Sequence, residues 1–452
     1  MNSMKYVGVA GVASLIFWQG IANAQTDTRY GEGALADALT NGFFKDHGVT
    51  VSGLLDIGYS RNNRSTHEER EDGSTNNPVT GQGDENFQFR SLHLFVDKPL
   101  AGNFLPRVTP TPGPAPTEAS FGFNIEALYG RNAQFARTFG WDMHWDINSP
   151  GDDDPAKASR DRQNFLAVPN LLATAYLPWG PGVTVWGGIF GPATGNEIPP
   201  NLRKSQNLFV SKTYAFLSEP GPVSGFVAAT KVYQGDGGII SVEGGPVRGF
   251  KNLRDNNSST SVIGALRWRS TDMKTWVDYE FFTGNEQNDD FSDVQAPTSR
   301  IVSDANQRRT QHALTLRHEF SSPWMISGEL VYGEQDGDGK RSTIDVVSGP
   351  GFDGAHWWGA NAVASYRVSP ALSLSGRIEH FEDPDGFVLY PVSLAHSAYN
   401  AATLGARYDV NKFVTVRPEV RYDWQTDADR NAFARGRNQS QLTGMVELLV
   451  YF

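Results

Sequence analysis

The sequence predicts an all-β fold, a transmembrane antiparallel β-barrel of about sixteen strands, and three observations support this prediction. First, the last fourteen residues, 439–452, carry apolar side chains at every second position and mostly polar ones between them, and they end on the aromatic Phe452. A period of two is typical of a strand with one apolar face. Second, similar stretches recur along the chain from residue 49. Third, short links between these stretches alternate with long polar ones.

The first 24 residues predict a secretory signal peptide that is cleaved after Ala24. Lys5 supplies an early positive charge, residues 7–18 are apolar, and Ala22-Asn23-Ala24 has the small residues of a cleavage site. The apolar run is shorter than the roughly 20 residues that a helical membrane anchor needs. Together with the strand-rich remainder, this segment predicts a protein of the bacterial outer membrane.

The composition excludes several kinds of site. The chain has no cysteine, which excludes disulfides, thiol chemistry and Cys-ligated metals. Its net charge of -11 argues against nucleic acid as a partner. A mean hydropathy of -0.41 would also fit a soluble exported protein, so composition does not separate the two classes. Aromatic residues at 12%, with 47 glycines, suit strands and tight turns.

Residues 25–48 are predicted to form an N-terminal periplasmic or plug segment with a short helix. Leu35, Ala38, Leu39 and Phe43 recur at helical spacing. Two interpretations fit this pattern. The helix lies under or inside the mouth of a barrel, or it is a short helix of an ordinary exported domain.

Residues 49–452 are predicted to form the barrel. The predicted strands are 49–60, 87–97, 119–130, 165–177, 182–190, 222–232, 238–250, 259–269, 274–283, 308–319, 324–334, 355–367, 371–381, 397–409, 413–424 and 439–452. An even number of strands puts both ends of the chain in the periplasm. The weakest strand is 238–250, because Glu243 and Pro246 interrupt its apolar face. Pro169 also falls inside a predicted strand, where it removes a hydrogen-bond donor.

The connections alternate in length. Short periplasmic turns are predicted at one end and long extracellular loops, such as 131–164 and 191–221, at the other. Long loops of this kind argue against a compact soluble domain. One link on the short side, 98–118, is long and is Pro-rich over 106–118, so we expect a stiff, exposed excursion there.

In the later strands, charged residues occupy the positions between the apolar ones. Arg417, Glu419 and Arg421 alternate with Val420 and Tyr422, for example. An Arg or Lys facing lipid at mid-bilayer costs about 2–4 kcal/mol, so these side chains are predicted to point into a wet lumen. The predicted pore-lining and selectivity residues are Arg267, Arg317, Arg377, Arg407, Arg417, Arg421, Glu319, Glu379, Glu419 and Asp423.

A large soluble β-sandwich or lectin-like domain is the competing fold. It has the same period of two with its faces reversed, so the alternation alone does not separate the two folds. Aromatic residues near strand ends, such as Trp179, Trp324 and Trp424, are typical of membrane interfaces and favour the barrel. The signal peptide and the terminal Phe452 favour it too.

The long stretch 191–221 is the predicted constriction loop. It follows glycines at 187, 188 and 191, where missing side chains let another segment approach closely. Its predicted pore-facing residues are Asn196, Glu197, Asn201 and Arg203. Acids there, opposite Arg on the wall, would set a transverse field that favours polar solutes. The alternative is an external cap that never enters the pore.

The segment 183–222 resembles the β-barrel porin-2 (OmpL-like) family. A strand ends in a Gly-rich turn, and a Gly-x-Glu (Gly195 to Glu197), a later Asn, an aromatic-rich run and a Pro follow. The stretch 377–387, RIEHFEDPDGF, is similar to an acidic Asp-Pro turn of that family. The final strand departs from the common terminal signal, because Glu447 occupies a position often held by Gly. The resemblance spans most of the mature chain and implies a passive outer-membrane channel without a catalytic signature.

No catalytic residue, metal or cofactor is predicted. The nine histidines are scattered, and none lies in a recognisable nucleophile motif. The acidic stretches 151–154 and 336–339 are of a type that can bind calcium through oxygen. In the second stretch, Lys340 occupies a position where a calcium ligand would be needed. A solvated loop is the favoured interpretation of both stretches.

The sequence therefore predicts a porin through which small hydrophilic solutes (ions, sugars or other small nutrients) diffuse passively. Its other expected partners are outer-membrane lipid and, as the candidate assembly, two further copies in a homotrimer. One alternative is a structural or adhesive surface barrel whose lumen is plugged, with 35–45 as the plug. Another is an outer-membrane hydrolase, whose activity would depend on one Ser or His.

Overall fold

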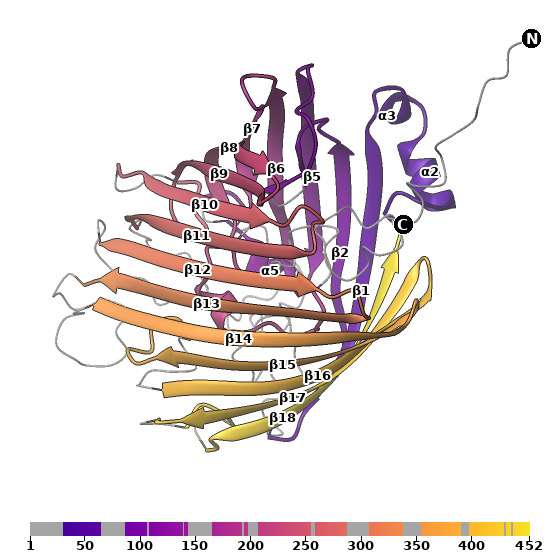
Figure 1. The fold of residues 1–452 in the computed structure, drawn as a ribbon. Helices are drawn as coiled ribbons and strands as arrows, with labels where there is room; N and C mark the ends of the chain where they lie inside the picture. Colours follow the sequence, from indigo (N-terminus) through magenta and orange to yellow (C-terminus); the bar gives the residue numbers. More distant parts are fainter. Residues whose placement is uncertain are drawn as a thin grey trace, which may run out of the picture.

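Sixteen strands form one closed antiparallel barrel, as the sequence predicts (Figure 1). The structure is a computed structural model and describes residues 30–64, 86–105, 108–138, 140–142, 165–191, 194–197, 207–254, 258–286, 307–337, 354–389, 397–428, 431–434 and 437–452. β1 (Thr50–Asn62) pairs with β18 (Ser440–Tyr451) to close the ring. At that seam the backbones of Gly53 and Phe452 exchange hydrogen bonds of 2.8 and 3.0 Å.

The remaining barrel strands are β2 (Asn86–Lys98), β5 (Ser120–Gly130), β6 (Phe165–Leu177), β7 (Val183–Phe190), β8 (Val223–Gly235), β9 (Gly238–Val247), β10 (Ser261–Arg269), β11 (Thr275–Asn285), β12 (Arg308–Glu319), β13 (Trp324–Asp336), β14 (Gly354–Ser369), β15 (Leu372–Asp383), β16 (Ser397–Asn411) and β17 (Val414–Thr426). A separate small sheet contains β3 (Phe104–Leu105) and β4 (Thr109–Pro110). Neighbours in the chain are neighbours in the ring, with β2 beside β5. Every predicted strand is present, with ends within about three residues of those predicted from the period-two pattern.

The two irregular strands have physical explanations. The weakest predicted strand, β9, forms but ends at Val247, before Arg248. Pro169 fits inside β6 because the pairing with β5 shifts there: Glu126 faces Asn170, whereas Leu128 faces Ala167. An irregularity of this kind takes one residue out of the ladder, and this is where a residue without an N–H is tolerated.

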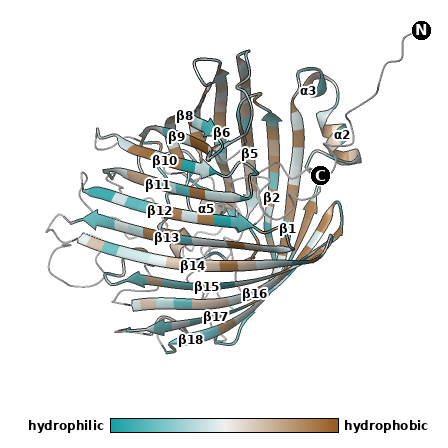
Figure 2. Ribbon diagram, in the orientation of Figure 1, coloured by the Kyte–Doolittle hydropathy of each residue, from teal (hydrophilic) through white to brown (hydrophobic). Residues whose placement is uncertain are grey.

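The apolar face of each strand points outward and the charged face points inward. On β17, Arg421 and Asp423 are 0% exposed, whereas Val420 is 51% exposed. On β15, Arg377 is buried and its neighbour Ile378 is 64% exposed. Figure 2 shows hydrophobic and hydrophilic residues alternating along the strands. A soluble sandwich would bury its apolar face instead, so the reversed exposure confirms the barrel.

Short turns lie at the end of the barrel where β1 begins and β18 ends. They are 178–182, 236–237, 270–274, 320–323, 370–371 and 412–413, and the links at the other end are longer. In barrels of this architecture the short-turn end is periplasmic. The predicted alternation of short turns and long loops is therefore confirmed.

The Pro-rich link between β2 and β5 is exposed at several positions, as its composition predicts, but it is also attached to the barrel wall, which was not predicted. Its described part packs against inward-facing side chains of the wall: Lys231 Nζ donates to the carbonyl oxygens of Thr111 (3.2 Å) and Gly113 (2.9 Å). The Tyr176 hydroxyl donates to the Pro116 carbonyl (2.8 Å). Proline-rich backbone keeps its carbonyl acceptors while losing donors, so donors on the wall can hold it.

The N-terminal segment contains α2 (Ala34–Thr40) and α3 (Phe43–Asp46), which lie beside the start of β1 (Figure 1). The Thr40 side chain hydrogen-bonds the backbone of Val51 on β1. Leu35 and Phe43 are 53% and 69% exposed, so the predicted apolar side of this helix does not pack on the barrel. The predicted signal peptide lies outside the described residues. No described helix is long and apolar enough to cross a membrane.

Candidate functional site

The link between β7 and β8, residues 191–222, reaches inward-facing side chains on the opposite wall; we call it the inner loop, and its described residues are 191, 194–197 and 207–222. The Gly195 N–H donates to Glu280 Oε2 on β11 (2.9 Å), and the Asn196 N–H donates to Glu329 Oε1 on β13 (3.2 Å). Gly195 has a φ of +73°, and a side chain there would collide with the carboxyl group of Glu219. Glycine is therefore required for this crossing.

The second part of the inner loop is fastened to β17 through Glu419. The Val210 N–H donates to Glu419 Oε2 (2.6 Å), and the Ser211 N–H donates to the same carboxylate (3.3 Å). The Ser211 hydroxyl also donates to Glu419. These groups are buried, so the carboxylate satisfies donors that water does not reach.

A third attachment is formed by Tyr214, the first residue of α7 (Tyr214–Ser218). Its N–H donates to Glu379 Oε2 on β15 (2.7 Å), and its hydroxyl donates to Asp423 Oδ1 on β17 (2.7 Å). Tyr214 is fully buried and packs in an aromatic cluster inside the barrel with Trp357, Phe381 and Tyr399. The start of α7 is therefore held by both polar and apolar contacts.

Arginines of the wall balance these carboxylates. Arg377 Nη1 lies 2.8 Å from Glu197 Oε1 of the inner loop. Arg421 lies between Glu379 (2.6 Å) and Asp423 (2.7 Å). We call Glu197, Arg377, Glu379, Glu419, Arg421 and Asp423 the anchoring cluster. Next to it, Arg417 pairs with Glu447 and donates to the Asn207 carbonyl of the inner loop.

A second charged network surrounds Arg267 on β10. Its guanidinium lies 2.9 Å from Glu243, 2.9 Å from Asp278 and 2.7 Å from Glu280. Glu280 is the carboxylate that also receives the Gly195 N–H. The two networks are thus joined by the inner loop.

Other predicted residues lie apart from the inner loop or outside the described residues. Arg317 pairs with Glu319 (3.0 Å) and Arg407 with Asp409 (3.1 Å), both towards the periplasmic end. Asn201 and Arg203 lie outside the described residues, as does the acidic stretch 151–154. The prediction missed Glu280, Glu329 and Ser211. The two glutamates occupy polar positions in the alternation of their strands, so the alternation could have identified them.

Glu219, after α7, lies beside a second carboxyl group. The carboxyl groups of Glu219 and Glu329 both lie next to Gly195, and Glu280 and Glu197 are also close enough to repel the charge of Glu219. Burial, followed by the Glu329 charge, raises the pKa of Glu219 well above its usual range. A buried carboxylate beside other carboxylates is unfavourable, so the docked loop favours neutral Glu219.

Docking of the inner loop is expected to weaken as the pH rises. The pKa of Glu219 is higher when the loop is docked than when it is undocked. The stabilisation of docking by Glu219 is therefore complete below the free pKa of about 4.5, and it is lost as the pH rises through the pKa of the docked state. For one proton the slope is at most about 1.4 kcal/mol per pH unit. Single-channel conductance measured from pH 4 to 9 should rise, and Glu219→Gln should flatten the dependence. Exposed Glu118→Gln is the control, and an equally steep profile in Glu219→Gln would contradict this origin.

The structure also brings together a Ser, a His and an acid that the sequence analysis did not connect. Ser91 Oγ lies 3.0 Å from His93 Nε2, and His93 Nδ1 lies 2.8 Å from Glu126 Oε1. Nucleophilic catalysis uses such a chain, but the nucleophile must reach its substrate. Ser91 and Glu126 are 0% exposed, so we interpret the three side chains as a buried structural network. Among the described residues, no cluster of His, Asp or Glu is arranged to hold a metal ion.

A closed sixteen-stranded barrel with an apolar outside, a charged inside and a loop folded against its inner wall defines the porin class of outer-membrane proteins. The family model described as "Putative beta-barrel porin-2, OmpL-like" matches residues 48–452, and the chain belongs to this family. The resemblance seen in the sequence is thereby confirmed. The family places the protein in the outer membrane and gives it a general channel role. No curated protein matches the sequence.

Solved structures share the fold at low sequence identity. The trimer form of OmpT, an outer membrane protein of Vibrio cholerae, has a TM-score of 0.50 and 10% identity, covering 89% of this chain and 99% of that chain. The anion-selective porin from Comamonas acidovorans has a TM-score of 0.48 and 12% identity, covering 89% and 99%. The outer membrane channel DcaP of Acinetobacter baumannii has a TM-score of 0.49 and 10% identity, covering 90% and 98%. At these identities the likeness concerns the fold.

Proposed function

We propose that this chain is a passive diffusion channel for small hydrophilic solutes and that the inner loop narrows its lumen. The observation that carries this proposal is the attachment of the loop to carboxylates on β11, β13, β15 and β17. A segment held at so many points across the interior reduces the open cross-section. Because most contacts use backbone N–H groups, the loop is held at a fixed depth.

The fixed charges around the inner loop determine which solutes cross the lumen easily. Acids of the loop and wall face arginines of the wall, and fixed charges of opposite sign in a narrow space produce a field that orients water and dipolar solutes. These charges compensate polar molecules for part of the hydration energy that they lose on entry, whereas apolar molecules receive no such compensation. Transport of this kind follows the solute gradient, with no covalent step and no cofactor. For the assembly we propose a homotrimer, with outer-membrane lipid against the remaining apolar surface.

The refolded protein should form discrete channels in a planar lipid bilayer. In vesicles, it should admit small sugars faster than larger ones, because the inner loop limits size. Stepwise conductance and swelling rates of sugar-loaded liposomes measure these properties. A folded barrel that produces neither conductance nor swelling would instead support a surface barrel with a plugged lumen, and deletion of 35–45 would then be expected to open it.

A further inference from the structure

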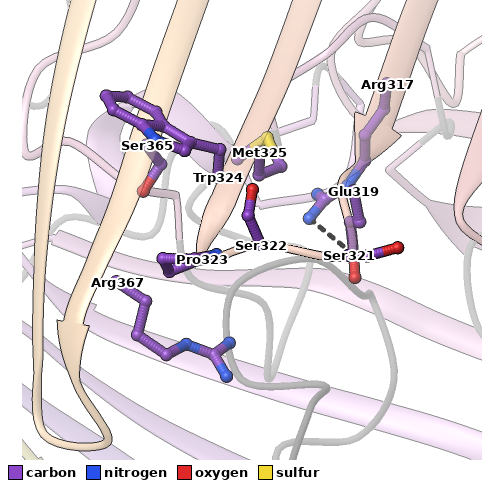
Figure 3. A pocket seen from close by; sticks show the side chains of 9 residues that line it. All are labelled: Arg317, Glu319, Ser321, Ser322, Pro323, Trp324, Met325, Ser365 and Arg367. Carbon is purple, nitrogen blue, oxygen red and sulfur yellow. Dashed lines mark hydrogen bonds and ion pairs between the residues drawn. The ribbon is translucent and has the colours of Figure 1, made fainter.

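A recess of about 260 Å³ lies at the periplasmic end of the inner wall, beside the turn between β12 and β13. Its charged lining residues are Arg317 and Glu319 on β12 and Arg367 on β14. The hydroxyl groups of Ser321, Ser322 and Ser365 complete its polar lining. Figure 3 shows the two arginine side chains entering this region from different strands, with Ser322 between them. None of the residues that line the recess belongs to the inner loop or to the anchoring cluster.

The recess carries an excess of positive charge and of hydrogen-bond donors. The lining holds two guanidinium groups and one carboxylate, and Arg317 Nη2 is paired with Glu319 Oε1 (3.0 Å). Lys274 and Arg367 also lie close enough to act on the charge of Glu319. One carboxylate therefore faces three cations. Arginine donors are arranged as a planar fork that matches a carboxylate or phosphate group.

Arg317 is held in place and retains a donor that is not used. Its guanidinium carbon lies 5.8 Å from the centre of the Trp276 ring. Its Nε–H is buried and has no acceptor among the described residues. Leaving a charged donor unsatisfied is unfavourable, and an anionic group bound beside this guanidinium would offset the cost by its charge.

We propose that this recess is a binding site for a compact organic anion that carries one phosphate or carboxylate group and one or more hydroxyls. The two guanidinium groups would bind the anionic group, and the serine hydroxyls would bind the hydroxyls of the solute. A cavity of about 150 Å³ holds benzene with its six carbon atoms, so about 260 Å³ corresponds to roughly ten non-hydrogen atoms. Because it faces the lumen at the periplasmic mouth, the site would receive solutes that leave the pore.

This inference deepens the proposed channel function, but its test does not depend on conduction. Binding of glycerol 3-phosphate to the full-length folded protein in detergent is measured by calorimetry, with glycerol as the neutral control. Wild-type protein should bind the phosphate ester at millimolar concentration and should not bind glycerol. Absence of this binding overturns the proposal. Binding without any bilayer conductance would leave the site intact and overturn the channel function instead.

Two variants that should weaken binding and one that should strengthen it identify the site. Arg317→Gln and Arg367→Gln should each weaken binding by roughly tenfold or more, since each removes a charged hydrogen-bonding partner. Glu319→Gln should strengthen binding, because it removes the carboxylate that competes for Arg317. Exposed Arg248→Gln at the other end of the barrel should have no effect. Unchanged binding in both arginine variants, or weaker binding in Glu319→Gln, would overturn the assignment of the site. If an arginine variant does not fold, the binding measured with Glu319→Gln tests the assignment instead.

Discussion

Replacing Glu419 with alanine is expected to raise the single-channel conductance and to make it fluctuate. Glu419 accepts from the N–H groups of Val210 and Ser211 and from the Ser211 hydroxyl. An unsatisfied buried donor costs about 1–3 kcal/mol, so the two N–H groups alone would destabilise docking by roughly 2–6 kcal/mol. Each 1.4 kcal/mol changes the ratio of docked to undocked loop about tenfold. Undocking moves 207–213 away from the wall and widens the path.

Single-channel recording in planar bilayers measures this effect. The matched control is Glu334→Ala, which removes an exposed glutamate from the outer side of β13. Heat-dependent migration in gels establishes that both variants are folded barrels. A folded Glu419→Ala barrel with the conductance of wild type would show that the loop does not limit the path.

The stability of the barrel should depend strongly on Arg421. This side chain is 0% exposed and lies between Glu379 and Asp423. Its guanidinium carbon also lies 5.0 Å from the centre of the Tyr214 ring. Removing one partner of a buried ion pair costs about 3–5 kcal/mol, because the remaining charges lose their compensation. Arg421→Met should therefore lower the unfolding free energy by about this amount.

Denaturant unfolding in detergent micelles, followed by tryptophan fluorescence, measures this loss. Arg61→Met, at an exposed arginine of β1, should be neutral. Adding Glu379→Gln and Asp423→Asn to Arg421→Met should recover much of the loss, since it removes the two uncompensated carboxylates. If Arg421→Met unfolds like wild type, or if the triple variant is no better than the single one, the ion-pair explanation is wrong.

These expectations change how the predicted wall charges are understood. The alternation in the sequence predicts that Arg377, Arg417 and Arg421 point into a wet lumen. Their inward direction is confirmed, but all three are nearly buried by the inner loop and by their carboxylate partners. In the described structure they anchor the loop, and their contribution to selectivity stays a proposal. A charge substitution at Arg421 would thus change loop docking as well as ion preference.

The sequence by itself determined the strands, their number and which face of each strand meets lipid. These properties follow from local alternation, because successive side chains of a strand point to opposite faces. The same pattern placed β9 correctly despite Glu243 and Pro246. The alternation could not say which faces are inside without the further observation that charge on a lipid face is costly.

Only the tertiary structure decided which charges meet. Glu419 and Ser211 are separated by 208 residues, and Arg377 and Glu197 by 180, so no local pattern relates them. The attachment of the Pro-rich link to the wall was not predicted for the same reason, since its acceptors are satisfied by Lys231 and Tyr176 on distant strands. Backbone periodicity is a local property, whereas the pairing of loop donors with wall carboxylates depends on closure of the ring, which brings remote strands to face one another.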